Sequence, residues 1–518
     1  MSTVDPGQAL RARLSEAGID LTYPEAVMRE VEAWEREPGI DDPTLEDRTE
    51  LPFVSVDGPN TRDLDQALFV ERRGAGFGVQ YAIADAAWFV RAGSALFEES
   101  LRRGASYYLP SEAIPMLPRP LSEGLISLGP AVDRRAMVFD MTLDAEGLCT
   151  RTEVVRARIR SRHQLTFDEV EAVVDGRSEH PVRDPAIVAS LQQMRVVGQL
   201  RANDAQARGV VPYHRSEVRV RLTPGVDARL SAVEVARNHV EADNAQLSLL
   251  CNAEGARYLR DRASSAGEAH PIYRIHPPPS DESLEQLQAC IDAAARAQGL
   301  EGAWRWDREH GSLAEFVRCL PQDDAHARFA AAISRQTIMV NLRSTYAREP
   351  GPHYGVGSEV YARFSAPMRE VVGVFLHKEM WEVIAGKGDA PGRDEALRQH
   401  VIESANRSRE LQRQLSAAAD QRVIDDLFFA DLAQPLAARP AHLGTLMGMR
   451  RGRAYVQLDD PPLDIKVYVD RLDRGYRCDA LGVVLSRAGK PVARLGDAVA
   501  VRVLDRDAQG RWSLDFVD

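Results

Sequence analysis

The segment from Leu51 to Ala84 constrains the fold most, because it reads as three β-strands with three aspartates in the first connection. LPFVSVD, QALFVER and VQYAIADA are typical of strands, and GAGFG between the last two is typical of a hairpin turn. Asp63 and Asp65 share one face of the second strand, with Leu64 turned to the core, since residues two apart in an extended chain point the same way. The Gly-Pro-Asn turn brings Asp57 back toward them, so we predict three converging carboxylates.

Converging carboxylates repel one another unless a cation or a proton neutralises them. Mg²⁺ is bound in proteins by one or two carboxylates, waters and substrate phosphate oxygens, so an open acidic loop favours phosphoryl chemistry. A calcium-binding EF-hand is excluded, because the twelfth position counted from Asp57 is Leu68 where a glutamate is needed. A solvated acidic hairpin without a ligand is the alternative that these residues leave open.

The spacing of cysteines and histidines limits which metal sites the sequence can form. No two of the five cysteines are closer in sequence than Cys290 and Cys319, which excludes CxxC zinc and redox patterns, and the histidines form no HExxH cluster. Any metal is therefore expected to be a hard ion held by oxygen. The chain also lacks the GxxxxGK and GxSxG strings that mark P-loop and serine-hydrolase sites.

Helical patterns surround this β region. Residues 1–49 read as a short helical segment, in which Val27, Val31 and Trp34 recur at helical spacing. A long helix is predicted over 238–262, and another is predicted to begin after an N-cap at Ser280.

The C-terminal residues change pattern again. After a linker near 433–442, the short alternating strands AYVQL, IKVYV, VAVRVL and WSLDFV predict a small closed barrel of the OB type. Such barrels bind single strands through a basic groove and stacked aromatic rings, for which Tyr455, Tyr468, Tyr476 and Trp512 are candidates unless they are core residues. The fold class is therefore α+β, with parts at 1–49, 50–435 and 442–518.

Charge is uneven along the chain. The net charge of −12 counts against a simple nucleic-acid coat protein, yet residues 442–518 hold 13 basic and 11 acidic residues and are the electrically favourable end for nucleic acid. No stretch approaches the roughly 18 apolar residues of a membrane span, and the N-terminus shows no signal-peptide core. We therefore expect a cytoplasmic protein that does not enter a membrane.

Several strings taken together resemble the RNase II/RNase R family of exoribonucleases. LPFVSVDGPNTRDLDQAL resembles the opening aspartate motif of that family, and SYYLPSEAIPMLPRPLSEGLISL, VEADNAQLSLLCNAE and HYGVGSEVYARFSAPMR follow in the family's order. The resemblance runs from about residue 50 to the end. It implies an RNB catalytic domain of mixed sheets and helices around a central RNA channel, then a C-terminal S1 domain, with only the helical segment where the family has cold-shock barrels.

The resemblance also implies a function. A monomer would hydrolyse single-stranded RNA from its 3′ end to nucleoside 5′-monophosphates, using one or two Mg²⁺ ions, or Mn²⁺. The implied metal or water-orienting positions are Asp57, Asp63, Asp65 and Gln66. The other implied roles are stacking on the 3′-terminal base for Tyr108, a ribose or base contact for Glu241, a grip on the scissile phosphate for Arg369, and a late catalytic carboxylate for Asp420, with Glu410 as its substitute.

The sequence departs from the family pattern at three of these places. Gln66 stands at the fourth aspartate, Gly373 stands where an aspartate is expected, and the late acid has no clear match beyond Asp420. These departures motivate an alternative, a catalytically impaired RNA-binding protein on an RNB scaffold. A DNase with the same metal chemistry is a third possibility, and it depends on how Glu241 and its neighbours read the ribose.

Overall fold

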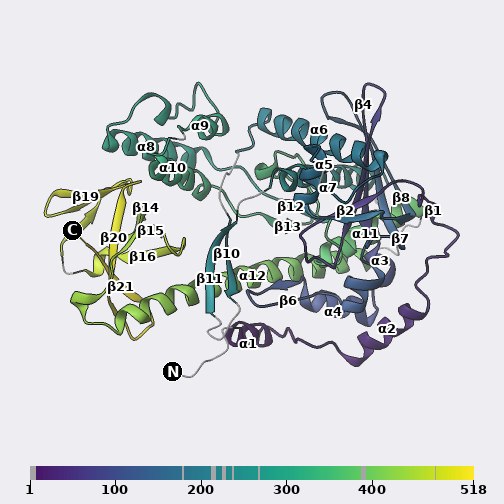
Figure 1. Cartoon of the computed structure of the whole chain (residues 1–518), viewed down its shortest axis with the longest axis horizontal. Helices are drawn as coiled ribbons and strands as arrows, with labels where there is room; N and C mark the ends of the chain where they lie inside the picture. The colour runs from purple at the N-terminus through teal and green to yellow at the C-terminus, as the bar shows by residue number, and fades with distance from the viewer. Residues whose placement is uncertain are drawn as a thin grey trace.

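The computed structural model places a large mixed sheet with its helices in one half of the molecule and a smaller sheet in the other (Figure 1). A single long helix, α12 (Arg393–Leu432), runs between the two halves. No helix in the described part of the chain is long and apolar enough to span a membrane. The structure describes residues 7–177, 180–211, 217–223, 229–235, 238–266, 269–321, 323–386, 393–472 and 474–517.

Within the described residues the large sheet has seven strands in the order β1-β8-β7-β4-β3-β2-β9. Every residue of β4 is buried, so helices or loops cover both faces at the centre of this sheet. Most neighbours are antiparallel, whereas β1 with β8 and β2 with β9 are parallel. The strands are β1 (Glu46–Asp47), β2 (Val54–Val56), β3 (Gln66–Arg73), β4 (Gly76–Ala84), β7 (Asp133–Leu143), β8 (Cys149–Arg160) and β9 (His163–Leu165).

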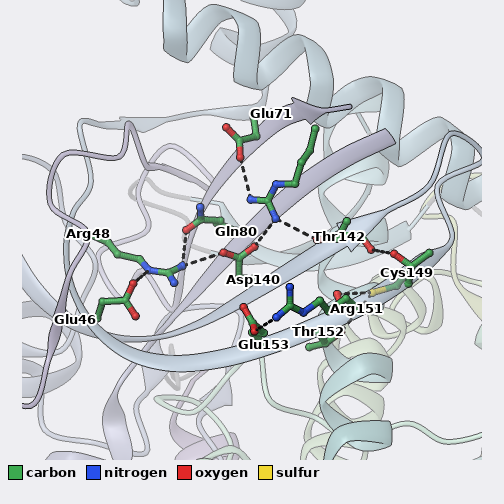
Figure 2. A network of polar contacts seen from close by, with 12 residues as sticks. Glu46, Arg48, Glu71, Gln80, Asp140, Thr142, Cys149, Arg151, Thr152 and Glu153 are labelled. Carbon is green, nitrogen blue, oxygen red and sulfur yellow. Dashed lines mark hydrogen bonds and ion pairs between the residues drawn. The ribbon is translucent and has the colours of Figure 1, made fainter. Parts of the chain in front are cut away.

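A network of ion pairs and hydrogen bonds links neighbouring strands of this sheet (Figure 2). The Asp140 carboxylate on β7 accepts hydrogen bonds from Arg48 at 3.3 Å and from Arg73 at 3.1 Å. Arg48 also donates to the buried Gln80 side chain of β4 at 2.7 Å. These charges satisfy one another, so the functional site must be sought elsewhere.

Among the described residues, six helices pack in the half of the molecule that contains the large sheet. Helix α7 confirms the helix expected over 238–262, and it carries a buried stripe in which Val240, Leu247 and Cys251 are almost inaccessible to solvent. The Ser190 hydroxyl of α6 accepts the Val70 N–H of β3, so this helix is fixed directly to the sheet. The packing helices are α3 (Ala86–Phe89), α4 (Ala95–Arg103), α5 (Phe167–Val174), α6 (Pro185–Ala207), α7 (His239–Ala266) and α11 (Val371–Ala385).

The N-terminal segment forms the two helices α1 (Gln8–Glu16) and α2 (Glu25–Arg36), as the helical pattern predicted. Val27 and Val31 are buried, and the Trp34 ring meets Phe89 edge to face at 5.3 Å. The Glu30 carboxylate accepts the first N–H groups of α4, where negative charge is stabilised by the helix dipole. This segment is therefore integrated into the larger half.

The four strands expected in the C-terminal half are present as β15, β16, β20 and β21. A five-stranded sheet in the order β16-β15-β14-β20-β21 is accompanied by the three-stranded sheet β17-β18-β19. Among the residues described, no hydrogen-bonded pairing joins β16 to β21, and Phe428 of α12 packs edge to face on Trp512 beside that gap. The strands are β14 (His442–Arg450), β15 (Arg453–Leu458), β16 (Asp464–Tyr468), β17 (Tyr476–Cys478), β18 (Val484–Arg487), β19 (Lys490–Arg494), β20 (Ala498–Arg506) and β21 (Trp512–Phe516).

This packing separates the four aromatic candidates into two groups. Trp512 and Tyr476 are buried, and their polar atoms donate to Asp425 and Asp515, so these two rings are core residues. Tyr455 and Tyr468 remain partly exposed and are the rings that could stack on a ligand.

The smaller sheet is held rigidly by helices α8 (Asp281–Gln298), α9 (Leu313–Cys319) and α10 (Ala327–Met339). Ser280 caps α8 as predicted, accepting the Ser283 N–H at 3.2 Å. The Gln336 amide of α10 donates to the Met447 carbonyl of β14 at 2.6 Å, and Arg328 forms a two-pronged ion pair with Asp459. The hairpin of β10 (Glu217–Thr223) and β11 (Arg229–Val235) packs between α12 and this half.

Candidate functional site

Asp57 begins the site at the end of β2, where its N–H donates to the Leu165 carbonyl of β9. Its carboxylate oxygen Oδ1 accepts the Gly58 N–H at 2.6 Å and the Thr61 hydroxyl at 3.0 Å. The side chain is half-buried. The turn therefore fixes this carboxylate through one oxygen.

Asp63 and Asp65 follow in the extended segment that enters β3, with Leu64 buried between them as predicted. Asp65 is 2% exposed. Its Oδ1 accepts the Met368 N–H at 3.0 Å, and its Oδ2 accepts from Arg369 Nε at 2.6 Å. The acidic loop and the SAPMR loop, which are 304 residues apart in sequence, therefore meet at Asp65.

The pKa shifts of Asp63 and Asp65 follow mainly from burial, and neighbouring carboxylates add to them. Burial raises the pKa of Asp65 to about 6, although the Arg369 guanidinium opposes the shift. Burial also raises the pKa of Asp63, and the nearby Asp57 and Glu123 carboxylates add to the rise against the opposing effect of Arg369. Glu123 lies in a short π-helix (Pro120–Leu125) and escaped the sequence reasoning, although it is the acid of the string PLSEGL.

Gln66 lies behind these carboxylates and connects two elements. Its amide nitrogen donates to the Ser365 carbonyl at 2.5 Å, and its amide oxygen accepts a hydrogen bond from the buried Tyr81 hydroxyl. Asn252 of α7 secures the same loop by accepting the Phe364 and Ser365 N–H groups at 2.7 and 3.0 Å. Gln66 thus positions the loop that carries Arg369, and its role as a metal ligand stays a prediction.

The glycine at 373 has a steric explanation. A Cβ added there would lie 2.7 Å from the Pro367 Cα, closer than real Cβ contacts come. The first turn of α11 is therefore packed directly against the SAPMR loop, and an aspartate at 373 would require the backbone to move.

A cavity of about 280 Å³ opens beside Arg369. Tyr108 of β5 (Tyr107–Tyr108) lines it with half of its side chain exposed. The Gln412 side chain of α12 holds the Tyr108 backbone in two hydrogen bonds, at 2.9 and 3.1 Å. The other polar residues that line the cavity are Ser106, Arg274, Tyr346, Arg363, Glu370, Ser408 and Arg409.

Two predicted residues lie away from this cavity. Glu241 is in the first turn of α7, two turns or about 10 Å before Ser248, whose hydroxyl binds the Ser365 hydroxyl at 2.9 Å. Asp420 is exposed on α12, about 12 Å beyond Gln412, and its charged neighbour is Asp464 of β16. The α12 side chains that line the cavity include Ser408, Arg409 and Gln412, which the sequence reasoning missed, and Glu410 is exposed and paired with Arg413.

The donor set of the acidic loop fits a hard divalent ion. All of its ligand atoms are oxygens, and the Asp57 and Glu123 carboxylates add to the rise that burial causes in the pKa of Asp63, so negative charge gathers beside this side chain. Each oxygen of Asp65 accepts one hydrogen bond, and Oδ1 of Asp57 accepts two. Each carboxylate oxygen has two lone pairs, so these contacts leave acceptor positions for a metal, and the number of ions stays a prediction.

A tighter acidic cluster exists elsewhere. Over the described ranges, the one group of three potential ligands with its atoms all within 4.8 Å of one another is Glu379, Glu382 and Asp394. The Lys378 ammonium lies among them, at 3.0, 2.7 and 2.7 Å. This is a lysine-centred ion-pair cluster, and a cation is already present in it.

Comparison with known proteins decides the family. The family model described as "RNB domain" matches residues 45–386, which is well over half of the chain. The chain belongs to the RNB-domain family. The predicted membership in the RNase II/RNase R group is confirmed, and the matched range ends within the part predicted as 50–435.

Named relatives extend the match beyond the RNB domain. Ribonuclease R of Escherichia coli is 27% identical over 509 residues, covering 96% of this chain and 60% of the relative, and Exoribonuclease 2 of Klebsiella pneumoniae is 28% identical over 425 residues, covering 80% and 61%. The chain thus spans about three fifths of the length of these relatives. The structure of Mycoplasma genitalium RNase R in complex with ribose-methylated single-stranded RNA shares the fold, with a TM-score of 0.84 at 20% identity over 99% of this chain and 78% of that one.

Proposed function

We propose that this chain is a metal-dependent, hydrolytic 3′→5′ exoribonuclease that degrades single-stranded RNA to nucleoside 5′-monophosphates. The observation that carries the proposal is the ion pair of Asp65 with Arg369, which joins the acidic loop to an arginine-lined cavity that a half-exposed tyrosine also lines. The relatives named ribonuclease R and exoribonuclease 2 support the same substrate class.

Each residue has a physical role in this proposal. Asp57 and Asp63 would hold Mg²⁺ or Mn²⁺, which when bound activates water and offsets charge on the phosphoryl oxygens. Asp65 orients the guanidinium of Arg369 toward the scissile phosphate, whose geometry matches the planar fork of arginine. Tyr108 stacks on the terminal base without regard to its identity, since every base has a π-face. The roles of Glu241 and Asp420 stay predictions.

The direct test uses the purified wild-type chain with Mg²⁺ and a 5′-labelled single-stranded RNA. We expect nucleoside 5′-monophosphates to be released while the labelled RNA shortens, and EDTA to stop the reaction. RNA binding without nucleotide release would support the alternative of an impaired scaffold, which the occupied amide of Gln66 favours. A DNA oligonucleotide of the same sequence, degraded equally fast, would instead indicate a nuclease that ignores the ribose.

Substituting Tyr108 tests the stacking role. Tyr108→Ala removes the exposed ring and should weaken RNA binding about tenfold, because base–aromatic stacking contributes roughly 1–3 kcal/mol per base. Tyr108→Phe is the matched control, since it keeps the ring and loses only the hydroxyl. Fluorescence anisotropy in EDTA measures both, and equal affinities of the two variants would contradict stacking by Tyr108.

Cleavage should depend on pH through the buried carboxylates. Burial raises the pKa of Asp65 to about 6, so its ionised form predominates only above that pH. As pH falls through about 6, protonation of Asp65 removes the charge that orients Arg369, and protonation of Asp63, whose pKa burial also raises, lowers the affinity for the metal, so the rate should fall. Because metal and proton compete for Asp63, added Mn²⁺ should restore the part of the rate near pH 5.5 that is lost through release of the metal. A rate that does not respond to metal there would indicate a different titrating group.

A further inference from the structure

The cavity beside Arg369 is lined by more arginines than the proposed contact with one scissile phosphate requires. Of the described residues, four arginines line it, and two of them have carboxylate partners. Arg369 pairs with Asp65 at 2.6 Å, and Arg363 pairs with Glu370 at 3.1 Å. The second oxygen of Glu370 accepts the Tyr346 hydroxyl at 2.5 Å, so this carboxylate is fully engaged.

The remaining two arginines, Arg274 and Arg409, meet at one serine. Arg274 comes from β12 (Tyr273–Ile275), and its Nε lies 3.3 Å from the Ser344 hydroxyl. Arg409 comes from α12 and donates to the Ser344 carbonyl at 2.7 Å and to its hydroxyl at 3.0 Å. Neither guanidinium forms an ion pair with a carboxylate in the described part of the chain, and both lie near the Tyr346 ring, at 6.0 and 5.6 Å.

This arrangement is electrostatically unfavourable without an anion. Burial lowers the pKa of Arg409, and the positive charges of Arg274 and Arg363 lower it further against the opposing effects of Tyr346 and Glu370. Burial lowers the pKa of the neighbouring His353 to about 3, with Arg274, His276 and Arg409 contributing to the shift. Two partly buried like charges raise the free energy of the folded protein unless an opposite charge is supplied. The neighbouring Glu370 carboxylate offsets part of this charge, but its two oxygens are bonded to Arg363 and to Tyr346, so one carboxylate faces three guanidinium groups. An anionic ligand between Arg274 and Arg409 would balance the remaining positive charge.

We propose that Arg274 and Arg409 form a second phosphate-binding site, whose occupant is the 3′-phosphate of an RNA with a phosphorylated 3′ end. Two guanidinium groups are the donors that match phosphate oxygens best. The site is distinct from Arg369, which is assigned to the scissile phosphate.

The position of Tyr108 selects the terminal phosphate over an upstream one. Tyr108 lines the same cavity and is the proposed stacking partner of the terminal base, so the other groups of this cavity face the terminal nucleotide. This inference rests on the proposed function in one respect, the entry of an RNA 3′ end into the cavity.

Binding measured in EDTA tests the site without requiring cleavage. Three fluorescent oligoribonucleotides of one sequence are compared: one with a 3′-hydroxyl, one with a 3′-phosphate, and one with a 3′-hydroxyl and a neutral methylphosphonate at the linkage preceding the scissile one. We expect the wild-type chain to bind the 3′-phosphate form more tightly than the 3′-hydroxyl form. Arg409→Gln should reduce that preference about tenfold, because it removes hydrogen bonds from a charged donor to the phosphate.

Three further variants make the result specific. Arg407→Gln removes the same charge from an exposed position of α12, two residues away, and should keep the preference. Arg409→Lys retains the charge without the planar fork and should keep part of it. Arg274→Gln alters the site from a different element and should repeat the effect of Arg409→Gln, which guards against a folding defect confined to α12.

Two outcomes would overturn the proposal. One is an equal affinity of the wild-type chain for the two ends, with Arg409→Gln and Arg407→Gln indistinguishable. The other is an effect of Arg409→Gln confined to the methylphosphonate comparison, which would place an upstream phosphate at these arginines. A chain that binds RNA in EDTA but releases no nucleotides with Mg²⁺ would contradict the proposed function and leave this measurement intact.

Discussion

Asp65→Asn should reduce the rate of RNA cleavage by about 10²–10³-fold and leave RNA binding in EDTA nearly unchanged. The carboxylate accepts from Arg369 Nε and from the Met368 N–H through its two oxygens, and an amide can accept through only one of them. Arg369 would then lose the partner that orients it. Loss of one preorganised electrostatic group in an active site typically raises the barrier by about 3–4 kcal/mol.

The measurement is a single-turnover rate on labelled single-stranded RNA with saturating Mg²⁺. Asp140→Asn is the matched control, because it makes the same change on β7 in the ion-pair network of Figure 2, outside the site. Combining Asp65→Asn with Arg369→Gln should cost little more than either change alone, since the two side chains act as one unit. Wild-type cleavage by Asp65→Asn would remove the acidic loop from the mechanism.

The local features of this site could be predicted from sequence because they depend on neighbours in the chain. The two-residue period of an extended strand buries Leu64 and places Asp63 and Asp65 on the other face, as the structure has them. The Ser280 cap and the buried stripe of α7 likewise follow from helix geometry within a few residues.

Contacts between distant segments could not be derived in this way. The meeting of Asp65 with Arg369 was expected only through the family resemblance, because periodicity carries no information across 304 residues. On α12 each residue turns the side chain by about 100° and advances it by 1.5 Å, so a late acid assigned by motif alone can fall far from the site. Asp420, about 12 Å beyond Gln412 on this helix, does not line the cavity that Gln412 lines, and its catalytic role stays a prediction.

Which aromatic side chains are buried in the C-terminal half also depends on contacts with distant segments. Trp512 alternates correctly for a strand and could have stacked on a ligand, but Phe428 and Phe429 of α12 cover it at 5.4 and 5.0 Å. No pattern within residues 442–518 reports the position of that helix. The strands were therefore predictable, whereas the choice between core and surface for this ring was not.

The same long-range packing makes Lys378→Met the substitution with the largest expected effect on stability. The ammonium of Lys378 on α11 offsets three carboxylates, of which Glu379 and Asp394 are 1% and 3% exposed. Removing one partner from a buried ion cluster typically costs about 3–5 kcal/mol, because the charges left behind are unpaired. Urea unfolding at pH 7 should show this loss, whereas Lys490→Met, at an exposed position of β19, should change stability by less than about 0.5 kcal/mol.

Two further measurements tie that loss to the carboxylates. Burial raises the pKa of Glu379 and of Glu382, so these groups bind protons more readily in the folded state than in the unfolded one. Stability of the variant should therefore recover as pH is lowered from 7 toward 5, since protonation replaces the missing positive charge. Mn²⁺ should raise the melting temperature of Lys378→Met by more than that of the wild-type chain, because the acidic loop is present in both and the variant adds three ligand atoms within 4.8 Å of one another with no ammonium among them. Equal stabilisation of both proteins would show instead that the cluster takes no metal after the loss of Lys378, and that any metal effect comes from elsewhere in the chain.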